Sequence, residues 1–220
     1  KRMMALWLCM VCCLSIEAAQ VDRKLLFNDG WKFWLGDEAT ASTVGFDDAS
    51  WRTLTLPHDW SIEHDFDVKY PSGNDGGYVM TGIGWYRKSF LVPSNMVGKR
   101  LSLYFEGVYM NSEVFVNGQS VGKRPYGYSS FIYDITPYVK VGEQNVVAVR
   151  VDNSKQRNCR WYTGAGIYRH VWLVTTEALH VAHWGTYITT PEVTKELAKV
   201  LVAVQVKNET EADKKAVVSV

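Results

Sequence analysis

Short stretches in which apolar and polar residues alternate occupy much of the chain. Residues 101–105, Leu-Ser-Leu-Tyr-Phe, show the period of two that is typical of a half-buried strand. Residues 145–151 are largely apolar, which indicates a buried strand. No segment before residue 151 keeps a helical period over several turns. The pattern therefore predicts an all-β fold.

Turn-forming residues separate these predicted strands. The clearest hairpin runs from Val114 to Gly122, where Asn117-Gly118 suits the positive φ angles of a type I′ turn. Short strands with regular turns indicate a jelly-roll β-sandwich, which we place at residues 21–178. Residues 61–84 show little periodicity, and such a long loop in a compact domain is usually functional or disordered. Further strands are predicted at residues 31–35, 51–56 and 85–92.

The strand pattern restarts at about Val181. Val202, Val204 and Val206 face one side of a predicted strand, and residues 187–190 and 216–220 also have strand character. We predict that residues 179–220 are the first strands of an incomplete immunoglobulin-like domain. Because so few strands cannot close a sandwich, the sequence is expected to be the front part of a longer protein.

The first twenty residues have the pattern of an export signal. Lys1 and Arg2 precede an apolar core at residues 3–14, and small residues follow near Ala18 and Ala19. The apolar core is short for a membrane span. We therefore predict export to the periplasm or the cell exterior, with an N-terminal membrane anchor as the weaker alternative.

Composition narrows the classes of partner. Lys and Arg number 24 and Asp and Glu number 23, with no basic run, so nucleic acid is not an expected partner. Three of the four cysteines lie in the N-terminal apolar stretch, which leaves Cys159 alone and excludes a disulfide framework in the body. The abundant Trp and Tyr suit stacking on sugar rings, and they also suit an all-β core.

Residues 160–169, Arg-Trp-Tyr-Thr-Gly-Ala-Gly-Ile-Tyr-Arg, form an unusual loop between two apolar runs. Loops usually carry small polar residues, so an aromatic and cationic loop suggests a surface that meets something flat. Its glycines permit close backbone approach. The alternative is an irregular core crossover in which Trp161 and Tyr168 fill space.

No complete active site can be assembled from the sequence. Glycoside hydrolysis needs a pair of carboxyl groups, and Asp59, Glu63, Asp65 and Asp67 lie close together beside Trp60. A solvated acidic loop explains this cluster better. The five histidines lack metal-ligand spacing, and no phosphate-binding loop is present, so neither a metal nor a cofactor is expected.

Several short motifs nevertheless follow one another in a distinctive order. They are FNDGWKF at 27–33, LPHDW at 56–60, GWYR at 84–87, VNG at 116–118, GYSSF at 127–131, DIT at 134–136 and WYTGAGIYR at 161–169. Together they resemble the N-terminal sugar-binding domain of glycoside hydrolase family 2, which is a galactose-binding-like jelly roll. The family includes β-galactosidases, β-glucuronidases and β-mannosidases. The resemblance covers about residues 25–174, and the rest resembles the family's immunoglobulin-like second domain.

The motif pair at 57–60 and 160–169 is most similar to β-galactosidases of Bacteroides-type bacteria. The glucuronidase version of the loop tends to read Asn-Tyr-Gly-Gly-Ile-Tyr-Arg. In the family, a (β/α)₈ barrel after the second domain carries both catalytic glutamates, so the resemblance implies no catalytic residue in this chain. Its partners would be that barrel and a terminal β-galactoside or related glycan. A homo-oligomer is compatible with the family.

The resemblance implies that loops of this domain help to wall the sugar pocket. A carboxylate accepts hydrogen bonds from sugar hydroxyls, a guanidinium donates them, and an aromatic face covers the C–H side. Asp59, Arg160 and Trp161 meet these needs and are predicted to bind substrate. The lactose-cleaving member has a carboxylate before its loop, where this chain has Asn158, Cys159 and Arg160, so a sodium-dependent contact is not expected. A free-standing carbohydrate-binding module or a purely structural sandwich are the alternatives.

Overall fold

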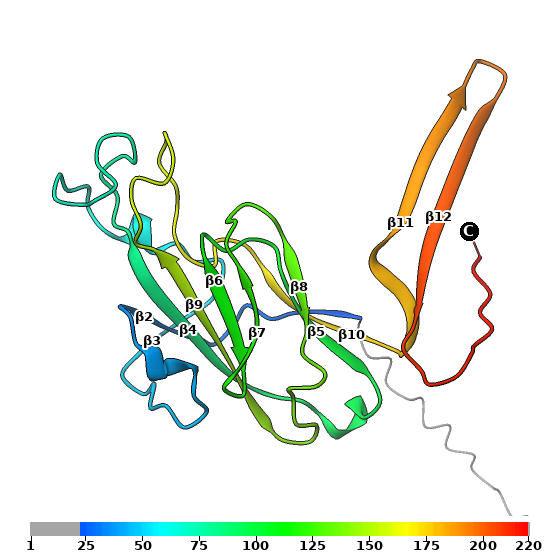
Figure 1. Ribbon diagram of the computed structural model, residues 1–220, viewed down its shortest axis with the longest axis horizontal. Helices are drawn as coiled ribbons and strands as arrows, with labels where there is room; N and C mark the ends of the chain where they lie inside the picture. Colours follow the sequence, from blue (N-terminus) through cyan, green and yellow to red (C-terminus); the bar gives the residue numbers. More distant parts are fainter. Residues whose placement is uncertain (1–22, 220) are drawn as a thin grey trace, which may run out of the picture.

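The computed structural model describes residues 23–219 and contains two antiparallel β-sheets packed face to face, followed by a long hairpin (Figure 1). The predicted export signal at residues 1–20 lies outside the described residues. The structure confirms the predicted all-β sandwich. Its helical segments are three short 3₁₀ turns, η1 (Ala39–Ser42), η2 (Trp60–Glu63) and η3 (Ser94–Met96). No helix within residues 23–219 is long and apolar enough to cross a membrane.

The strands form one sheet of six and one of four. The larger sheet has the order β3 (Arg52–Leu54), β2 (Trp31–Leu35), β4 (Gly82–Leu91), β9 (Gln144–Asn153), β6 (Ser112–Val116) and β7 (Gln119–Arg124). The smaller sheet has the order β1 (Lys24–Leu26), β10 (Val171–Thr176), β5 (Arg100–Phe105) and β8 (Phe131–Asp134). The predicted strand at 51–56 is shorter than expected, because Trp51 bends into an aromatic cluster and Pro57 follows closely.

The core lies between the two sheets and follows the alternation in the sequence. Leu101, Leu103 and Phe105 of β5 all point inward, and Phe105 stacks on Phe131 with ring centroids 5.0 Å apart. Strand β9 is buried on both faces, since Val149 lies in the core while Ala148 packs on the outer side of the sheet. The predictions of a half-buried β5 and a buried β9 are therefore confirmed.

The Asn117-Gly118 turn joins β6 and β7 as predicted. Both residues have positive φ, 48° and 83°, which is the signature of a type I′ turn. The Asn117 amide also donates to the Tyr138 carbonyl at 2.8 Å, and its oxygen accepts from the Val146 amide at 3.0 Å. This one residue therefore shapes the turn and fastens it to β9.

A second aromatic cluster covers the outer face of the six-stranded sheet. Trp51, Trp85, Ala41 and Ala148 form its buried part. The neighbouring Arg87 is 2% exposed and donates to the Asp48 carboxylate at 2.9 Å and to the Thr43 carbonyl at 3.0 Å. These contacts hold the segment between β2 and β3 against the sheet.

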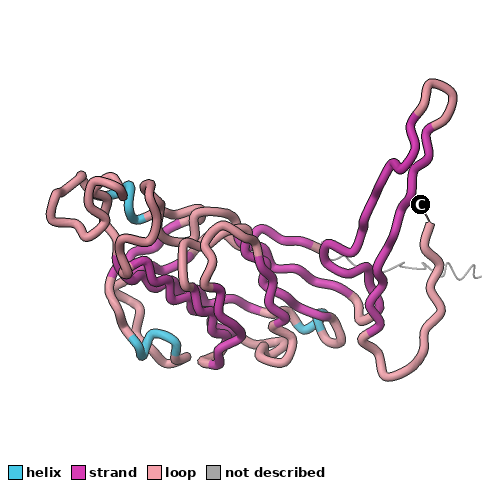
Figure 2. The backbone as a smooth tube through the Cα atoms, turned by 45° about the horizontal axis from the view of Figure 1, so that its top comes forward, coloured by secondary structure: helices cyan, strands magenta, loops and turns pink. Residues whose placement is uncertain are grey.

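The hairpin of β11 (Leu179–Val193) and β12 (Ala198–Asn208) extends away from the sandwich (Figure 2). Its strands agree with the restart of the pattern near Val181. The prediction of a strand at 216–220 is wrong for residues 216–219, which have no regular structure because no neighbouring strand among the described residues pairs with them. One hairpin does not form an immunoglobulin-like sandwich, so that assignment stays a prediction.

Candidate functional site

The two most distinctive motifs, 57–60 and 160–169, lie side by side at one end of the sandwich. The His58 amide donates to the Ile167 carbonyl at 2.8 Å, and the Trp60 amide donates to the Ala165 carbonyl at 3.2 Å. On the other side of the loop, Tyr109 and Gly166 exchange two backbone hydrogen bonds of 2.9 Å. The second half of the loop is thus fixed from both sides, and Ala165 and Ile167 are completely buried.

Two glycines make this close packing sterically feasible. A Cβ on Gly164 would collide with the Asp59 carboxylate. Gly166 has φ of 116°, and a Cβ there would lie 2.7 Å from the His58 carbonyl oxygen. The glycines therefore serve backbone contact between the two motifs.

Asp59 lies at the base of this arrangement and is partly buried. It caps η2, since its Oδ1 accepts a hydrogen bond from the Ser61 amide at 2.9 Å. The same oxygen accepts from the Ala165 amide at 2.8 Å, across 106 positions of sequence. No hydrogen bond within residues 23–219 involves Oδ2. One carboxylate oxygen therefore holds the loop, while the other lies against Gly164.

A series of polar side chains leads from the surface at Arg52 and Glu63 to the buried His58 and Tyr86 beneath the loop. Glu63 forms an ion pair with Arg52, and its Oε1 lies 3.2 Å from His58 Nε2. His58 Nδ1 lies 2.7 Å from the Tyr86 hydroxyl, which accepts from the Ile167 amide at 3.4 Å. Arg52 also lies 2.8 Å from His58 Nε2, so this nitrogen faces both the guanidinium and the Glu63 carboxylate.

Burial and the neighbouring charges set the ionisation states of these groups. Burial lowers the pKa of His58, although the Glu63 carboxylate opposes the shift, so the imidazole is neutral near pH 7. Burial would raise the pKa of Glu63, but its hydrogen bond from Arg52 and the nearby His58 bring it below the usual range. Burial raises the pKa of Tyr86 well above its usual value. This series of side chains therefore carries one negative charge, on Glu63, and one positive charge, on Arg52.

The first half of the loop is exposed. Trp161 is 71% exposed and Tyr162 61%, and their ring centroids lie 5.8 Å apart. Arg160 is also exposed. The Trp161 amide donates to Cys159 Sγ at 3.4 Å. The alternative that Trp161 fills the core is therefore wrong, whereas Tyr168 is partly buried and donates to the Gly127 carbonyl at 2.8 Å.

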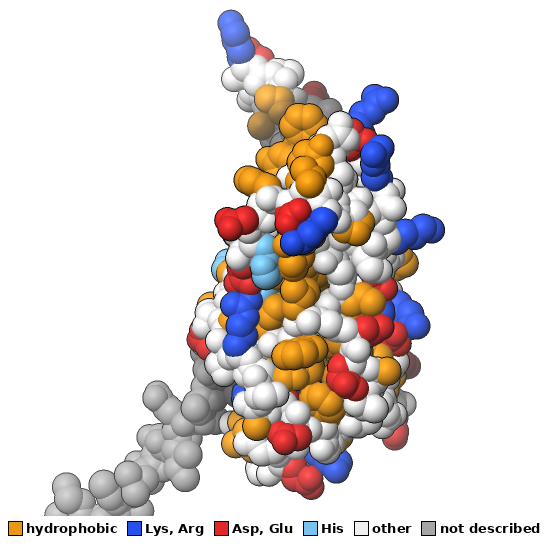
Figure 3. Space-filling model, turned by 90° about the vertical axis from the view of Figure 1, so that its left-hand side faces the viewer, with side chains coloured by type: hydrophobic (Ala, Val, Ile, Leu, Met, Phe, Trp, Pro, Cys, Tyr) orange, Lys and Arg blue, Asp and Glu red, His pale blue; other side chains and the backbone are white. Residues whose placement is uncertain are grey.

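The long segment at 64–81 lies beside this exposed loop, and the views in Figures 1 and 2 agree on their proximity. Arg157 forms an ion pair with Asp75 at 3.2 Å. A Cβ on Gly77 would lie 3.4 Å from the Cβ of Tyr162. Both loops carry exposed hydrophobic residues, among them Phe66 and Val68. The end of the molecule on this side shows a band of hydrophobic side chains bordered by charged ones (Figure 3).

The three predicted site residues thus lie in two different places on the loop and beneath it. Asp59 lies at the base and contacts the loop at Gly164 and Ala165, while Arg160 and Trp161 lie farther out on its exposed half. No hydrogen bond joins Asp59 to either of them among the described residues. Within that same range, no group of three or more His, Cys, Asp or Glu is placed to hold a metal ion.

Sequence reasoning missed the roles of Tyr86 and Arg52. Tyr86 lies in the motif at 84–87, yet nothing in an alternating strand shows that its hydroxyl meets His58 in the core. Arg52 lies in the predicted strand at 51–56, and no local pattern shows that its guanidinium binds Glu63 eleven positions later. The only available signal was the grouping of His58 with nearby acids.

Comparison with known proteins identifies the family of this chain. The family model described as glycosyl hydrolases family 2, sugar binding domain, matches residues 25–177. The chain belongs to glycoside hydrolase family 2. The match covers the whole sandwich and agrees with the boundaries of the motif series.

Individual relatives within family 2 point the same way. The β-galactosidase BoGH2A of Bacteroides ovatus is 50% identical over 206 residues, which are 94% of this chain and 24% of that protein. A putative β-glucuronidase of Formosa agariphila is 43% identical over 91% of this chain and 19% of its own length. A β-glycosidase structure from Bacteroides vulgatus superposes with a TM-score of 0.82 at 41% identity, covering 86% of this chain and 25% of that one. This chain spans at most about a quarter of these relatives.

Proposed function

We propose that the chain is the N-terminal, non-catalytic portion of an exported retaining β-glycosidase, a β-galactosidase that hydrolyses terminal β-galactosides. The observation that carries the proposal is the 50% identity to BoGH2A over nearly the whole chain. The catalytic carboxylates would lie in a barrel formed by later residues of the same polypeptide. This domain would complete the sugar pocket from one side.

Asp59, Arg160 and Trp161 have distinct parts in this proposal. Oδ2 of Asp59, which makes no hydrogen bond among residues 23–219, accepts a hydrogen bond from a sugar hydroxyl. Arg160 donates to hydroxyl oxygens, and the 71% exposed Trp161 covers the C–H face of the ring. The pinned second half of the loop keeps these exposed groups in place, which reduces the entropy lost on binding.

A β-glucuronidase is the second candidate, favoured by the 43% identical relative from Formosa agariphila. Assaying the full protein against chromogenic β-galactoside and β-glucuronide separates the two. We expect turnover of the galactoside to exceed that of the glucuronide by at least tenfold in kcat/KM. The reverse order would replace β-galactosidase with β-glucuronidase.

A free-standing carbohydrate-binding module is the third candidate, and purified residues 21–220 test it. We expect no glycoside turnover by this fragment and no tight glycan capture. Submillimolar binding of a galactoside by the fragment alone would favour the binding module instead.

The site residues are tested in the full protein by Arg160→Ala and Trp161→Ala, with Tyr187→Ala as the control. Tyr187 is 68% exposed on β11, so its loss removes an exposed aromatic without touching the loop. We expect KM to rise several-fold for the loop variants and to stay within twofold for the control. Unchanged kinetics in both loop variants would remove them from the site.

Export remains part of the proposal, on the basis of residues 1–20. N-terminal sequencing of the protein recovered from a native host should begin near residue 19 to 21. A retained leader in the cytoplasmic fraction would contradict it.

A further inference from the structure

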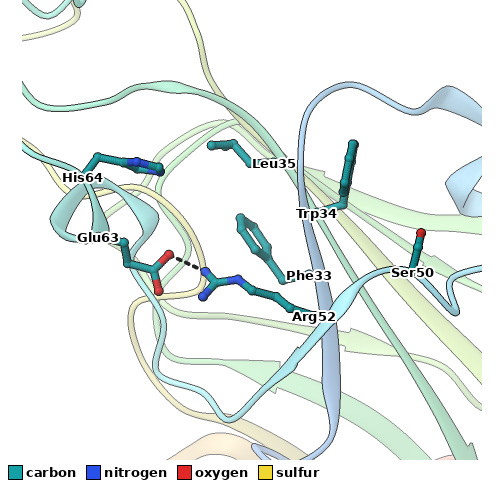
Figure 4. A pocket seen from close by; sticks show the side chains of 7 residues that line it. All are labelled: Phe33, Trp34, Leu35, Ser50, Arg52, Glu63 and His64. Atoms are coloured by element: carbon teal, nitrogen blue, oxygen red, sulfur yellow. Dashed lines mark hydrogen bonds and ion pairs between the residues drawn. The ribbon is translucent and has the colours of Figure 1, made fainter.

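A hollow of about 500 Å³ opens beside the edge of the six-stranded sheet, between β2, the entry to β3 and η2 (Figure 4). It exists because β3 pairs with β2 only over Trp31–Phe33. Trp34 and Leu35 continue β2 beyond the last paired residue, while the chain at Ser50 diverges from them. The volume is within the range of small-molecule sites.

One wall of this hollow is an exposed indole. Trp34 is 47% exposed and is seen edge-on in Figure 4, so that one face is turned across the hollow toward His64. Its ring also stacks with Trp51 at an interplanar angle of 19° and a centroid distance of 6.5 Å. Gly36 leaves room for the indole, because a Cβ there would lie 2.7 Å from Trp34 Nε1. The ring is thus held in orientation before any ligand arrives.

The opposite part of the hollow is polar and without net charge. Arg52 and Glu63 form an ion pair along one side, with the Arg52 guanidinium 5.1 Å above the Phe33 ring. Glu63 is further held by the buried His58. The pair offers donors and acceptors to hydroxyl groups at fixed positions. A ligand carboxylate would approach Glu63 and compete for Arg52, whereas a neutral polyol leaves the pair intact.

We propose that this hollow is a glycan-binding subsite that takes a neutral pyranose, stacked on Trp34 and hydrogen-bonded to the Arg52–Glu63 pair. An oriented aromatic face beside a fixed set of donors and acceptors is the arrangement that a sugar ring requires, with C–H groups on its faces and hydroxyls at its edge. This subsite is separate from Arg160 and Trp161 on the exposed loop, and it does not depend on the proposed function.

Fluorine NMR of the full protein labelled with 5-fluorotryptophan tests the proposal. The Trp34 resonance is identified by its absence in Trp34→Phe, and the Trp161 resonance in the same way. Galactose and glucuronic acid are titrated separately. We expect galactose to shift the Trp34 resonance saturably, with half-saturation on the order of 1–10 mM. Glucuronic acid should bind at least fivefold more weakly at this resonance.

Ser50→Phe tests the same hollow by filling it while leaving Trp34 and the ion pair in place. It should weaken the galactose response of Trp34 at least fivefold, and Tyr187→Ala on the hairpin should change it less than twofold. A Trp34 resonance that galactose does not move overturns the proposal, and equal or tighter binding of glucuronic acid overturns its neutral class. A shift at Trp161 alone supports the loop site and refutes this one, so the two outcomes are distinguishable.

Discussion

The contact between Asp59 and the loop at 164–167 supports a quantitative prediction. Asp59→Ala removes the acceptor for two backbone amides, those of Ser61 and Ala165. Ser61 is 2% exposed and Ala165 is fully buried, so water does not readily replace the carboxylate. Hydrogen bonds to charged groups contribute about 1.5–3 kcal/mol each. Losing the bond to Ala165 should therefore lower the free energy of local opening by about 1.5–3 kcal/mol.

Hydrogen–deuterium exchange of the full protein measures this opening directly, because it reports local unfolding without global denaturation. The predicted loss corresponds to roughly 10- to 150-fold faster exchange in a peptide spanning 164–169. Asp59→Asn keeps an oxygen acceptor and loses only the charge. We expect it to accelerate exchange by roughly fivefold, or about 1 kcal/mol.

Asp134→Ala is a matched control for the Asp59 variants. Asp134 makes the same local contact, accepting from the amide of Thr136 two residues later at 2.9 Å, but it is exposed. Its removal should leave exchange at 164–169 unchanged. If Asp59→Ala leaves that exchange within twofold of the unsubstituted protein, the long-range hydrogen bond does not hold the loop and the reasoning fails.

Three further predictions concern the same end of the sandwich. Gly166→Ala should lower the free energy of unfolding by about 2–4 kcal/mol, because the position has positive φ and a Cβ there would clash with the His58 carbonyl. Gly98 also has positive φ but has open space around it, so Gly98→Ala should lower it by about 1 kcal/mol. Equal losses of thermal stability in the two variants would contradict this reasoning. Tyr86→Phe should lower the free energy of unfolding by about 1–3 kcal/mol, because it leaves His58 Nδ1 and the Ile167 amide without a partner. An unchanged Tm would refute this prediction. The pKa of His58 is lower in the folded protein than its ordinary 6.5, so the unfolded chain takes up the proton first as the pH falls. The contribution of His58 to stability is therefore full above about pH 6.5 and decreases below it. His58→Gln should flatten the dependence of Tm on pH between pH 7.5 and 5.5, and an unaltered slope would count against this reasoning.

The strands were predictable because each satisfies a local rule. Alternation in residues 101–105 and the Asn117-Gly118 turn each specify their geometry within a few residues. The strand expected at 216–219 failed because a strand needs a hydrogen-bonding neighbour, and an apolar pattern does not provide one. The jelly-roll and immunoglobulin-like assignments rest on strand order and on later strands, which a pattern along one segment does not contain.

The site was predictable only in part, for a related reason. The exposure of Trp161 agrees with the idea of a surface that meets a ligand. The position of Asp59 beneath Gly164 and Ala165 depends on contacts across 106 positions of sequence, and no local pattern encodes them. The hollow beside Trp34 depends on where β3 stops pairing with β2, which is a property of the folded edge.

The loop at 160–169 has a buried half, which is held by backbone hydrogen bonds, and an exposed half. Residues 164–168 are held by backbone bonds to His58, Trp60 and Tyr109, so substitutions there should act through stability. Residues 160–162 are exposed and contribute little to the core, so substitutions there should act through ligand affinity. Asp59 belongs to both classes, because Oδ1 fixes the buried half while Oδ2 makes no hydrogen bond within the described part of the chain. Asp59→Asn is therefore the substitution that separates the two roles: a large rise in KM beside an acceleration of exchange no greater than the expected roughly fivefold assigns Oδ2 to the sugar.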